Sequence, residues 1–192
     1  HYRDRRQRQM CIRDSSHPTQ VLSDIFTIQE IKKKSISKLK LCWIGDANNN
    51  MMNSLIEACI KFSVSLNIAC PKSYQPNKML ISLIKKQKGK IKIFNKKEIA
   101  IKNSDVVMTD KIISLNDKVN KKKKLKSFKN FKVDAKTMNL AKKDAIFLHC
   151  LPRGNEVTEE VFLGKQSKVW QQALNRVYVQ KSILLYCFGK LR

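Results

Sequence analysis

The chain has 192 residues, 42% of them hydrophobic, and carries a formal net charge of +25 at pH 7. This length and hydrophobic fraction predict one globular domain with enough residues to bury a core. No run of about 18 apolar residues is present, which excludes a transmembrane helix, and the charged first residues do not resemble a signal peptide. Six cysteines without a C-x-x-C pair favour a reduced, cytoplasmic protein over a disulfide framework or a zinc site.

The large positive charge invites a nucleic-acid-binding interpretation. Most of the basic residues are lysines, however, and they are distributed along the chain from Lys32 onward. Phosphate-binding surfaces usually combine lysine with arginine and aromatic side chains, because the guanidinium group grips phosphate and stacks on bases. We therefore expect a solvated lysine-rich surface without specific nucleic acid binding. A lysine-rich nucleic-acid-binding α/β module is the alternative from a different class of protein.

Residues 1–14 differ in composition from the rest of the chain. Five of the eight arginines lie within them, and none lies between Asp14 and Arg153. We expect a foreign or disordered leader there and leave it out of the fold prediction. A basic arm for nucleic acid is the alternative.

The first half of the remaining chain alternates between helix and strand patterns. A helix is predicted to begin within Ser15–Gln20, where Pro18 suits the first turn, and to end at Lys32–Lys34. Short apolar runs predict strands at 40–44, 66–70, 91–94 and 105–108. Periodic apolar residues predict helices after Asn48–Asn50, at 78–86 and at 97–102.

The second half continues the alternation after a lysine-rich segment, 118–129, that is predicted to be a loop. A helix at 135–142, a strand at 145–148 and a helix around 159–162 follow. The last predicted helix runs from about 168 to 188 and has Trp170, Ala173, Val177, Ile183 and Leu184 as its apolar residues. Strands that alternate with helices in this way predict an α/β fold, namely a Rossmann-like doubly wound parallel sheet flanked by helices.

Four polar clusters fall at predicted strand ends or helix starts, where α/β sheets bind ligands. They are His17 with Gln20, Asp46 with Asn48–Asn50, Asp110 with Ser114, and His149-Cys150 with Arg153. Each cluster alone is equally typical of helix caps, turns and buried core residues. Together they predict a small-molecule site with one carboxylate and one thiol. No dinucleotide, P-loop, serine-nucleophile or metal-binding motif accompanies them.

These clusters carry a resemblance to a known family. Ser16-His-Pro-Thr-Gln20 resembles the H-P-x-Q segment of the transcarbamoylases, and Trp43-Ile-Gly-Asp46 through Ser54 resembles W-[IV]-G-D-x-x-N-N-x-x-N-S. Asp110–Asn116 is similar to D-x-W-x-S-M-G, and His149–Arg153 matches H-C-L-P-R. The resemblance covers about residues 15–192. It points to the ornithine carbamoyltransferases within the aspartate/ornithine transcarbamoylase family.

The resemblance implies a role for each matching residue. Ornithine would be bound by Asn50, Asp110, Ser114 and the backbone at Leu115. Carbamoyl phosphate would be bound by His17, Gln20, Cys150, Leu151 and Arg176. Cys150 and Arg176 would be the catalytic residues, the first beside the reacting δ-amine and the second at the departing phosphate. The family needs no metal and no organic cofactor, because positioning and fixed charge supply the rate.

The chain departs from the family pattern at Ile112, Leu115 and Asn116, which replace Trp, Met and Gly, and at Leu174, which replaces Glu. The first three changes lie in the loop that would close over ornithine, and the fourth lies in the last predicted helix. The phosphate-binding S-T-R-T-R-type motif of the family's carbamoyl-phosphate domain is not found in this sequence. The expected organisation is therefore a leader at 1–14 and an ornithine-binding domain at 15–192, with the N-terminal carbamoyl-phosphate domain absent.

The implied activity of the parent enzyme is transfer of the carbamoyl group from carbamoyl phosphate to L-ornithine, giving citrulline and phosphate. The parent is expected to be a cytoplasmic homotrimer that does not bind membranes, and the ornithine-binding half alone is expected to show little turnover. Its first and last helices should then expose apolar side chains. A related transcarbamoylase that uses putrescine or an acylated ornithine is the alternative within the family.

Overall fold

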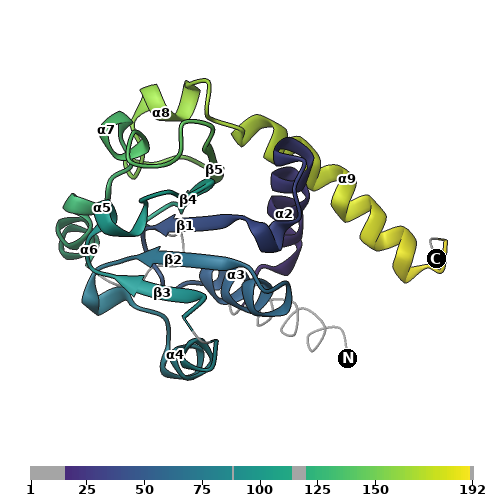
Figure 1. Ribbon diagram of the computed structural model, residues 1–192, viewed down its shortest axis with the longest axis horizontal. Helices are drawn as coiled ribbons and strands as arrows, with labels where there is room; N and C mark the ends of the chain where they lie inside the picture. The colour runs from purple at the N-terminus through teal and green to yellow at the C-terminus, as the bar shows by residue number, and fades with distance from the viewer. Residues whose placement is uncertain (1–15, 88, 114–119, 191–192) are drawn as a thin grey trace.

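The computed structural model describes residues 16–87, 89–113 and 120–190. Its centre is one sheet in which all five strands are parallel and lie in the order β3-β2-β1-β4-β5 (Figure 1). The strands are β1 (Lys40–Ile44), β2 (Ser65–Ala69), β3 (Ile91–Phe94), β4 (Val106–Asp110) and β5 (Ile146–Cys150).

Helices cover both faces of this sheet (Figure 1). The first face carries α2 (Pro18–Lys32), α3 (Asn50–Lys61) and α4 (Lys78–Lys85). The second face carries α5 (Lys97–Ala100), α6 (Lys121–Ser127), α7 (Ala135–Met138) and α8 (Glu159–Leu163). The last helix, α9 (Val169–Cys187), lies beside α2, and short 3-10 turns lie at Ile36–Lys38, Lys72–Tyr74 and Lys129–Phe131.

Successive residues of each strand point into two different hydrophobic clusters. On β1, Leu41 and Trp43 pack against α2 and α3, whereas Cys42 and Ile44 pack toward the helices of the second face. A strand that is buried on both sides needs apolar residues at every position, which is why the strands could be recognised as continuous apolar runs. The predicted doubly wound parallel sheet is confirmed.

Two predicted elements were wrong in detail. The lysine-rich segment predicted to be a loop contains the helix α6, which begins after Asn120, where the Asn120 side chain accepts a hydrogen bond from the backbone N–H of Lys123. The helix predicted over 135–142 ends at Met138. The helix propensity of the lysines, together with the asparagine cap, explains why α6 forms.

The contact between α2 and α9 is polar, which the apolar pattern of α9 did not predict. The buried residues of α9 are Val169, Gln172 and Asn175. Asn175 Nδ2 donates to Thr27 Oγ1 at 3.0 Å and to Glu30 Oε2 at 2.8 Å. Most of the apolar residues named for this helix are exposed, including Trp170 at 62%, whereas Ile183 is half-buried.

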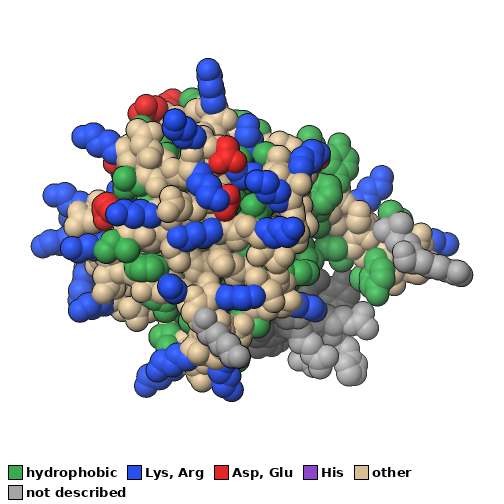
Figure 2. Space-filling model, in the orientation of Figure 1, with side chains coloured by type: hydrophobic (Ala, Val, Ile, Leu, Met, Phe, Trp, Pro, Cys, Tyr) green, Lys and Arg blue, Asp and Glu red, His purple; other side chains and the backbone are tan. Residues whose placement is uncertain are grey.

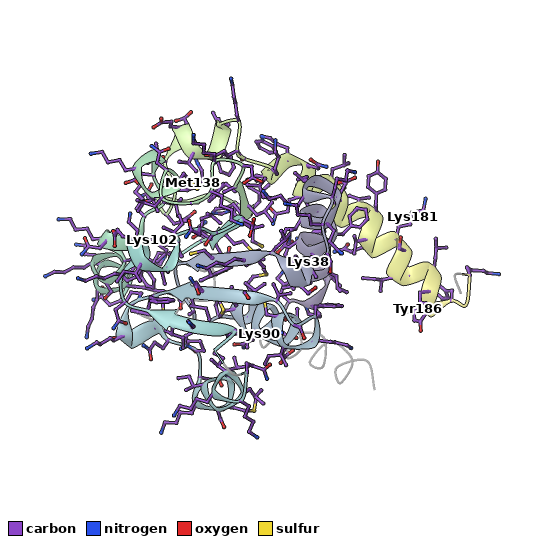
Figure 3. The ribbon with its side chains drawn as sticks, viewed as in Figure 1. Lys38, Lys90, Lys102, Met138, Lys181 and Tyr186 are labelled. Atoms are coloured by element: carbon purple, nitrogen blue, oxygen red, sulfur yellow. The ribbon has the colours of Figure 1, made fainter. Side chains whose placement is uncertain are left out.

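The outer half of α9 extends away from the sheet, and Lys181 and Tyr186 lie on it (Figures 1 and 3). Exposed apolar side chains on α2 and α9, such as Phe26 and Tyr186, confirm that these two helices leave apolar surface uncovered. No helix among residues 16–87, 89–113 and 120–190 is long and apolar enough to cross a membrane.

Lysine and arginine side chains are scattered over the visible face of the molecule rather than gathered in one stripe (Figure 2). Lys38, Lys90 and Lys102, for example, project from three separate segments (Figure 3). This distribution is the one expected for a solvated lysine-rich surface.

Candidate active site

The strand order places a topological switch point between β1 and β4. The chain leaves β1 toward α3 on the first face and leaves β4 toward α6 on the second face. Connections that diverge in this way open a crevice outside the carboxyl ends of the two strands, and open α/β sheets bind their ligands there. Most of the residues predicted to form the site lie at this edge.

The turn after β1 is shaped by Gly45 and Asp46. Gly45 has φ of 148°, and a Cβ atom there would lie 3.3 Å from Thr109 Oγ1, so glycine suits both the backbone conformation and the space. Asp46 is buried, its Oδ1 accepts from the backbone N–H of Asn48 at 2.8 Å, and its carbonyl accepts from the indole of Trp43 at 3.2 Å. The turn therefore delivers the chain to the start of α3 in a fixed conformation.

The two asparagines at the start of α3 have different positions. Asn49 is the N-cap, and its Oδ1 accepts a hydrogen bond from the backbone N–H of Met52 at 2.8 Å. Asn50 is the first helical residue and is half-buried. Because Asn49 is engaged in capping, Asn50 remains the asparagine predicted to contact a ligand.

Replacing Asn49 with alanine should lower the free energy of unfolding by about 1 kcal/mol, because an N–H in the first turn of α3 loses its acceptor. Urea unfolding of the purified chain measures this change. The control is Asn139→Ala, which removes an exposed asparagine and should change stability by less than about 0.5 kcal/mol. Asn103 would be a poor choice of control because its backbone φ is positive.

Asp110 is the last residue of β4 and is half-buried. Burial raises the pKa of its carboxyl group to about 6, although the backbone N–H of Lys111 donates to Oδ1 at 2.7 Å and the nearby His149 also acts to lower it. Glu156 and Asp46 add repulsion that raises the pKa further. Within the described residues no side-chain cation pairs with Asp110.

Cys150 ends β5 directly opposite Asp110 in the register of the two strands. Burial raises the pKa of the Cys150 thiol strongly, and the charges of Asp110 and Asp24 raise it further. The side chain is therefore a neutral thiol at physiological pH and not a thiolate nucleophile. Leu151 follows it in an exposed position, before a cis peptide bond to Pro152.

His149, one residue earlier, points to the second face and is fully buried. Its Nε2 lies 2.8 Å from Glu156 Oε1, and both side chains are almost inaccessible, at 0% and 3% exposed. Glu156 also accepts from the backbone N–H of Gly154 at 2.5 Å. This pair fixes the loop that begins with Cys150 and Leu151, so His149 supports the site rather than facing it.

A buried hydrogen-bond network joins α2, α9 and β5 beside Cys150. Gln20 Nε2 and Gln172 Nε2 both donate to Asp24 Oδ1, at 2.9 and 2.7 Å, and Gln172 Oε1 accepts from the backbone N–H of His149 at 3.0 Å. Arg176 on α9 is half-buried, and its charge acts on both Asp24 and Cys150. Asp24 and Gln172 thus join Gln20 to the end of the strand that carries Cys150.

Burial raises the pKa of Asp24 from 3.8 to about 6, despite its bonds from Gln172 and Gln20. The folded state therefore holds its proton more tightly than the unfolded state, and stability should fall by about 3 kcal/mol as the pH rises from below 4 to above 6. Asp24→Asn removes this titration and keeps an acceptor for both glutamines. Urea unfolding between pH 4 and pH 7.5 should show a smaller decline for the variant. An equal decline in both proteins would contradict the pKa assigned to Asp24.

His17 lies immediately before α2 and is half-buried, and its backbone N–H donates to Ser54 Oγ on α3 at 2.8 Å. It therefore belongs to the α2–α3 side of the site. Ser114 and Leu115, predicted to bind ornithine, and Asn116 lie outside the described residues. Ile112, which stands at the predicted tryptophan position, is buried in the hydrophobic cluster of the second face.

A pocket of about 570 Å³ opens beside this edge of the sheet. It is bordered by the segment after β4, by α6 and by the loop that contains Glu156, with Lys111, Ile112, Phe128 and Gly154 among its lining residues. This volume is sufficient for a small polar substrate. No group of three or more His, Cys, Asp or Glu side chains in residues 16–87, 89–113 and 120–190 is placed to hold a metal ion.

Sequence reasoning assigned no role in the site to three buried polar residues that organise it: Asp24, Gln172 and Lys124. The i, i+4 spacing of Gln20 and Asp24 on one helix was the available indication for Asp24. Gln172 lies 148 residues further along the chain than Asp24, and nothing local marks it. Lys124 stands within a run of four lysines and pairs with Asp46 at 2.7 Å.

The chain is an α/β domain that places a carboxylate, Asp110, and a neutral thiol, Cys150, at the carboxyl ends of neighbouring strands, with Arg176 of α9 acting on the same thiol. The family model for the Asp/Orn-binding domain of aspartate/ornithine carbamoyltransferases matches residues 37–187. The chain therefore belongs to the aspartate/ornithine carbamoyltransferase family, as the sequence motifs predicted. The comparisons do not favour a nucleic-acid-binding module.

Individual relatives agree with this assignment. The chain is 43% identical over 183 residues to the ornithine carbamoyltransferase of Methanococcus maripaludis, covering 91% of this chain and 60% of that protein. The structure of the anabolic ornithine carbamoyltransferase from Campylobacter jejuni matches with a TM-score of 0.84 and 39% identity, over 93% of this chain and 60% of that one. The Pyrococcus furiosus ornithine carbamoyltransferase matches with a TM-score of 0.83 and 34% identity, over 93% and 58%. The chain thus spans about three fifths of the length of these relatives.

Proposed function

We propose that this chain forms the ornithine-binding part of an enzyme that transfers the carbamoyl group of carbamoyl phosphate to the δ-amine of L-ornithine, giving L-citrulline and phosphate. The observation that carries the proposal is the position of Asp110. It ends β4 opposite Cys150, it is half-buried, and no side-chain cation of the described residues neutralises it. A substrate ammonium group is the partner that such a carboxylate lacks.

The other buried carboxylates at this edge already have partners. Asp46 pairs with Lys124, Glu156 pairs with His149, and Asp24 accepts from two glutamine amides. Asp110 is therefore the carboxylate best placed to hold the α-amino group of ornithine, and the family resemblance assigns Ser114 and the backbone at Leu115 to the same substrate. Asn50, at the start of α3, would hold the α-carboxylate.

The δ-amine would then lie against Cys150 and the carbonyl group of Leu151. In this position the amine must be neutral, because its lone pair attacks the carbonyl carbon of carbamoyl phosphate. A buried neutral thiol favours the uncharged amine through desolvation and places no anion beside it. As the new C–N bond forms, the bond between the carbamoyl carbon and the phosphate oxygen breaks, and the amine nitrogen releases a proton.

The departing phosphate would be stabilised by His17, Gln20 and Arg176. Positive charge and hydrogen-bond donors aimed at the developing negative charge lower the barrier for this step. Gln20 already donates one amide hydrogen to Asp24, which fixes its orientation. The reaction as written uses no metal or organic cofactor.

The whole enzyme is proposed to be a cytoplasmic homotrimer. Sedimentation of the intact assembly would test the trimer.

The test is a chimera in which this chain replaces the matched part of the Campylobacter jejuni enzyme, which amounts to 60% of that protein. We expect the chimera to form citrulline from ornithine and carbamoyl phosphate, and to use putrescine and N-acylated ornithine poorly. If the chimera prefers putrescine or an acylated ornithine, that amine takes the place of ornithine as the proposed acceptor. A folded chimera that carbamoylates none of these amines would overturn the proposal.

A further inference from the structure

Lys124 is a buried lysine in a helix that is otherwise exposed. Its neighbours Lys121, Lys122, Lys123 and Lys126 are all exposed, whereas Lys124 is 4% exposed. Its Nζ lies 2.7 Å from Asp46 Oδ2 and 5.6 Å from the centre of the Tyr74 ring. Lysine is almost never buried without a charge partner, so one side chain of the lysine run has been turned inward toward a specific carboxylate.

The position of that carboxylate connects α6 to the substrate-binding edge. Asp46 follows β1 at the switch point, and its other oxygen accepts from the backbone N–H of Asn48. That turn leads directly to the cap of α3 and to Asn50. A displacement of Asp46 would therefore move the residue that we assign to the ornithine carboxylate.

We propose that Lys124 is a positioning residue that acts through Asp46: it docks α6 against the carboxyl end of β1, fixes the turn that presents Asn50, and offsets part of the Asp46 charge that acts on Asp110. The proposal rests on the function proposed above, because it assigns Lys124 a part in ornithine binding. It does not require Lys124 to touch the substrate.

The charge of Asp46 matters because it acts on the carboxylate that would bind ornithine. It is one of the groups that raise the pKa of Asp110, and it also raises the pKa of the Cys70 thiol, after burial. Without Lys124, a second uncompensated anion would lie near the bound diamine and would favour its protonated form. The other charged or titratable groups that act on this edge are Asp24 from α2, His149 and Cys150 from β5, Glu156 from the following loop and Arg176 from α9.

The docking effect and the charge effect can be separated with four variants of the chimera described above. Lys124→Met keeps most of the length of the side chain and removes the charge, and Lys124→Arg keeps the charge. Lys124→Met combined with Asp46→Asn removes both charges and leaves neither partner buried alone. Lys122→Met makes the same substitution at an exposed site of the same helix.

For Lys124→Met we expect the KM for ornithine to rise by about 10- to 100-fold, since a small displacement of positioning groups has effects of this size. The acidic limb of the kcat–pH profile should also move to higher pH, because the bound amine loses its proton less readily. The double variant should keep the raised KM but return the limb to its original pH. Lys124→Arg and Lys122→Met should both keep the KM and the pH profile of the unmutated chimera.

If Lys124→Met gives the same KM and the same pH profile as Lys122→Met, the inference is wrong while the proposed function stands. If Lys124→Met fails to fold, the double variant and Lys124→Arg decide: an unchanged KM in the double variant overturns the positioning role. Failure of the unmutated, folded chimera to form citrulline is a different result and counts against the proposed function itself.

Discussion

Replacing Asp110 with asparagine in the chimera should lower kcat/KM for ornithine by about 100- to 1000-fold, because loss of one partner from a desolvated charge pair costs several kcal/mol. The change keeps the shape of the side chain and removes the charge proposed to hold the α-ammonium group. Most of the loss should appear in KM, since the α-amino group is remote from the reacting δ-amine and is bound equally in the ground and transition states.

The pH dependence gives an independent check. Burial raises the pKa of Asp110 to about 6, so the carboxyl group becomes protonated as the pH falls through that value, and KM for ornithine should rise below pH 6. This rise should be absent in Asp110→Asn. Asp144→Asn is the matched control. Asp144 lies in the loop before β5, is exposed and pairs with Lys32 at the end of α2. A KM that is unchanged in Asp110→Asn would mean that the α-amino group binds elsewhere.

The sheet could be predicted from the sequence because the apolar pattern of each strand is contained within a few consecutive residues. Strands that are covered on both faces must be apolar at successive positions, as in Leu41–Ile44, and polar residues interrupt them where they reach the edge. For the same reason Asp110 and Cys150 could be placed at strand ends. That they lie opposite each other depends on the register of β4 and β5, which no local pattern specifies.

The features that sequence reasoning missed depend on long-range geometry. Within the run Lys121–Lys124 every residue is identical, and only the orientation of α6 selects Lys124 for burial. Apolar periodicity could not identify the inward face of α9, because the amide groups of Gln172 and Asn175 make its buried contacts. A hydrogen-bonded interface has no hydrophobic period to recognise.

Replacing Glu156 with alanine should lower the free energy of unfolding of the chain by about 3 to 5 kcal/mol, because it leaves His149 buried without its partner. His149 Nδ1 is also buried and makes no hydrogen bond within the described residues, so the imidazole would have no remaining side-chain partner. Since domains of this size are stable by only about 5–15 kcal/mol, the variant should unfold at a much lower urea concentration.

The same pair predicts how this cost depends on pH. Burial alone would raise the pKa of Glu156, but the hydrogen bonds from His149 and from the backbone N–H groups of Gly154 and Glu156 outweigh it, so the pKa lies below its usual 4.5. A lowered pKa means that the ionised carboxylate stabilises the folded state above pH 4.5 and that this contribution is lost as the pH falls. The difference between the two proteins should therefore be smaller at pH 4 than at pH 7.

Glu159→Ala provides the control, because Glu159 is exposed in the first turn of α8 and should cost less than about 1 kcal/mol. Urea unfolding of all three proteins at both pH values measures these differences. Equal midpoints for Glu156→Ala and Glu159→Ala would contradict the role of the His149–Glu156 pair. A large loss in Glu156→Ala alone would mean that the loop holding Cys150 and Leu151 depends on the buried contact between His149 and Glu156 behind the sheet edge. Changes out of reach of the substrate could then disorder the reacting end of the site.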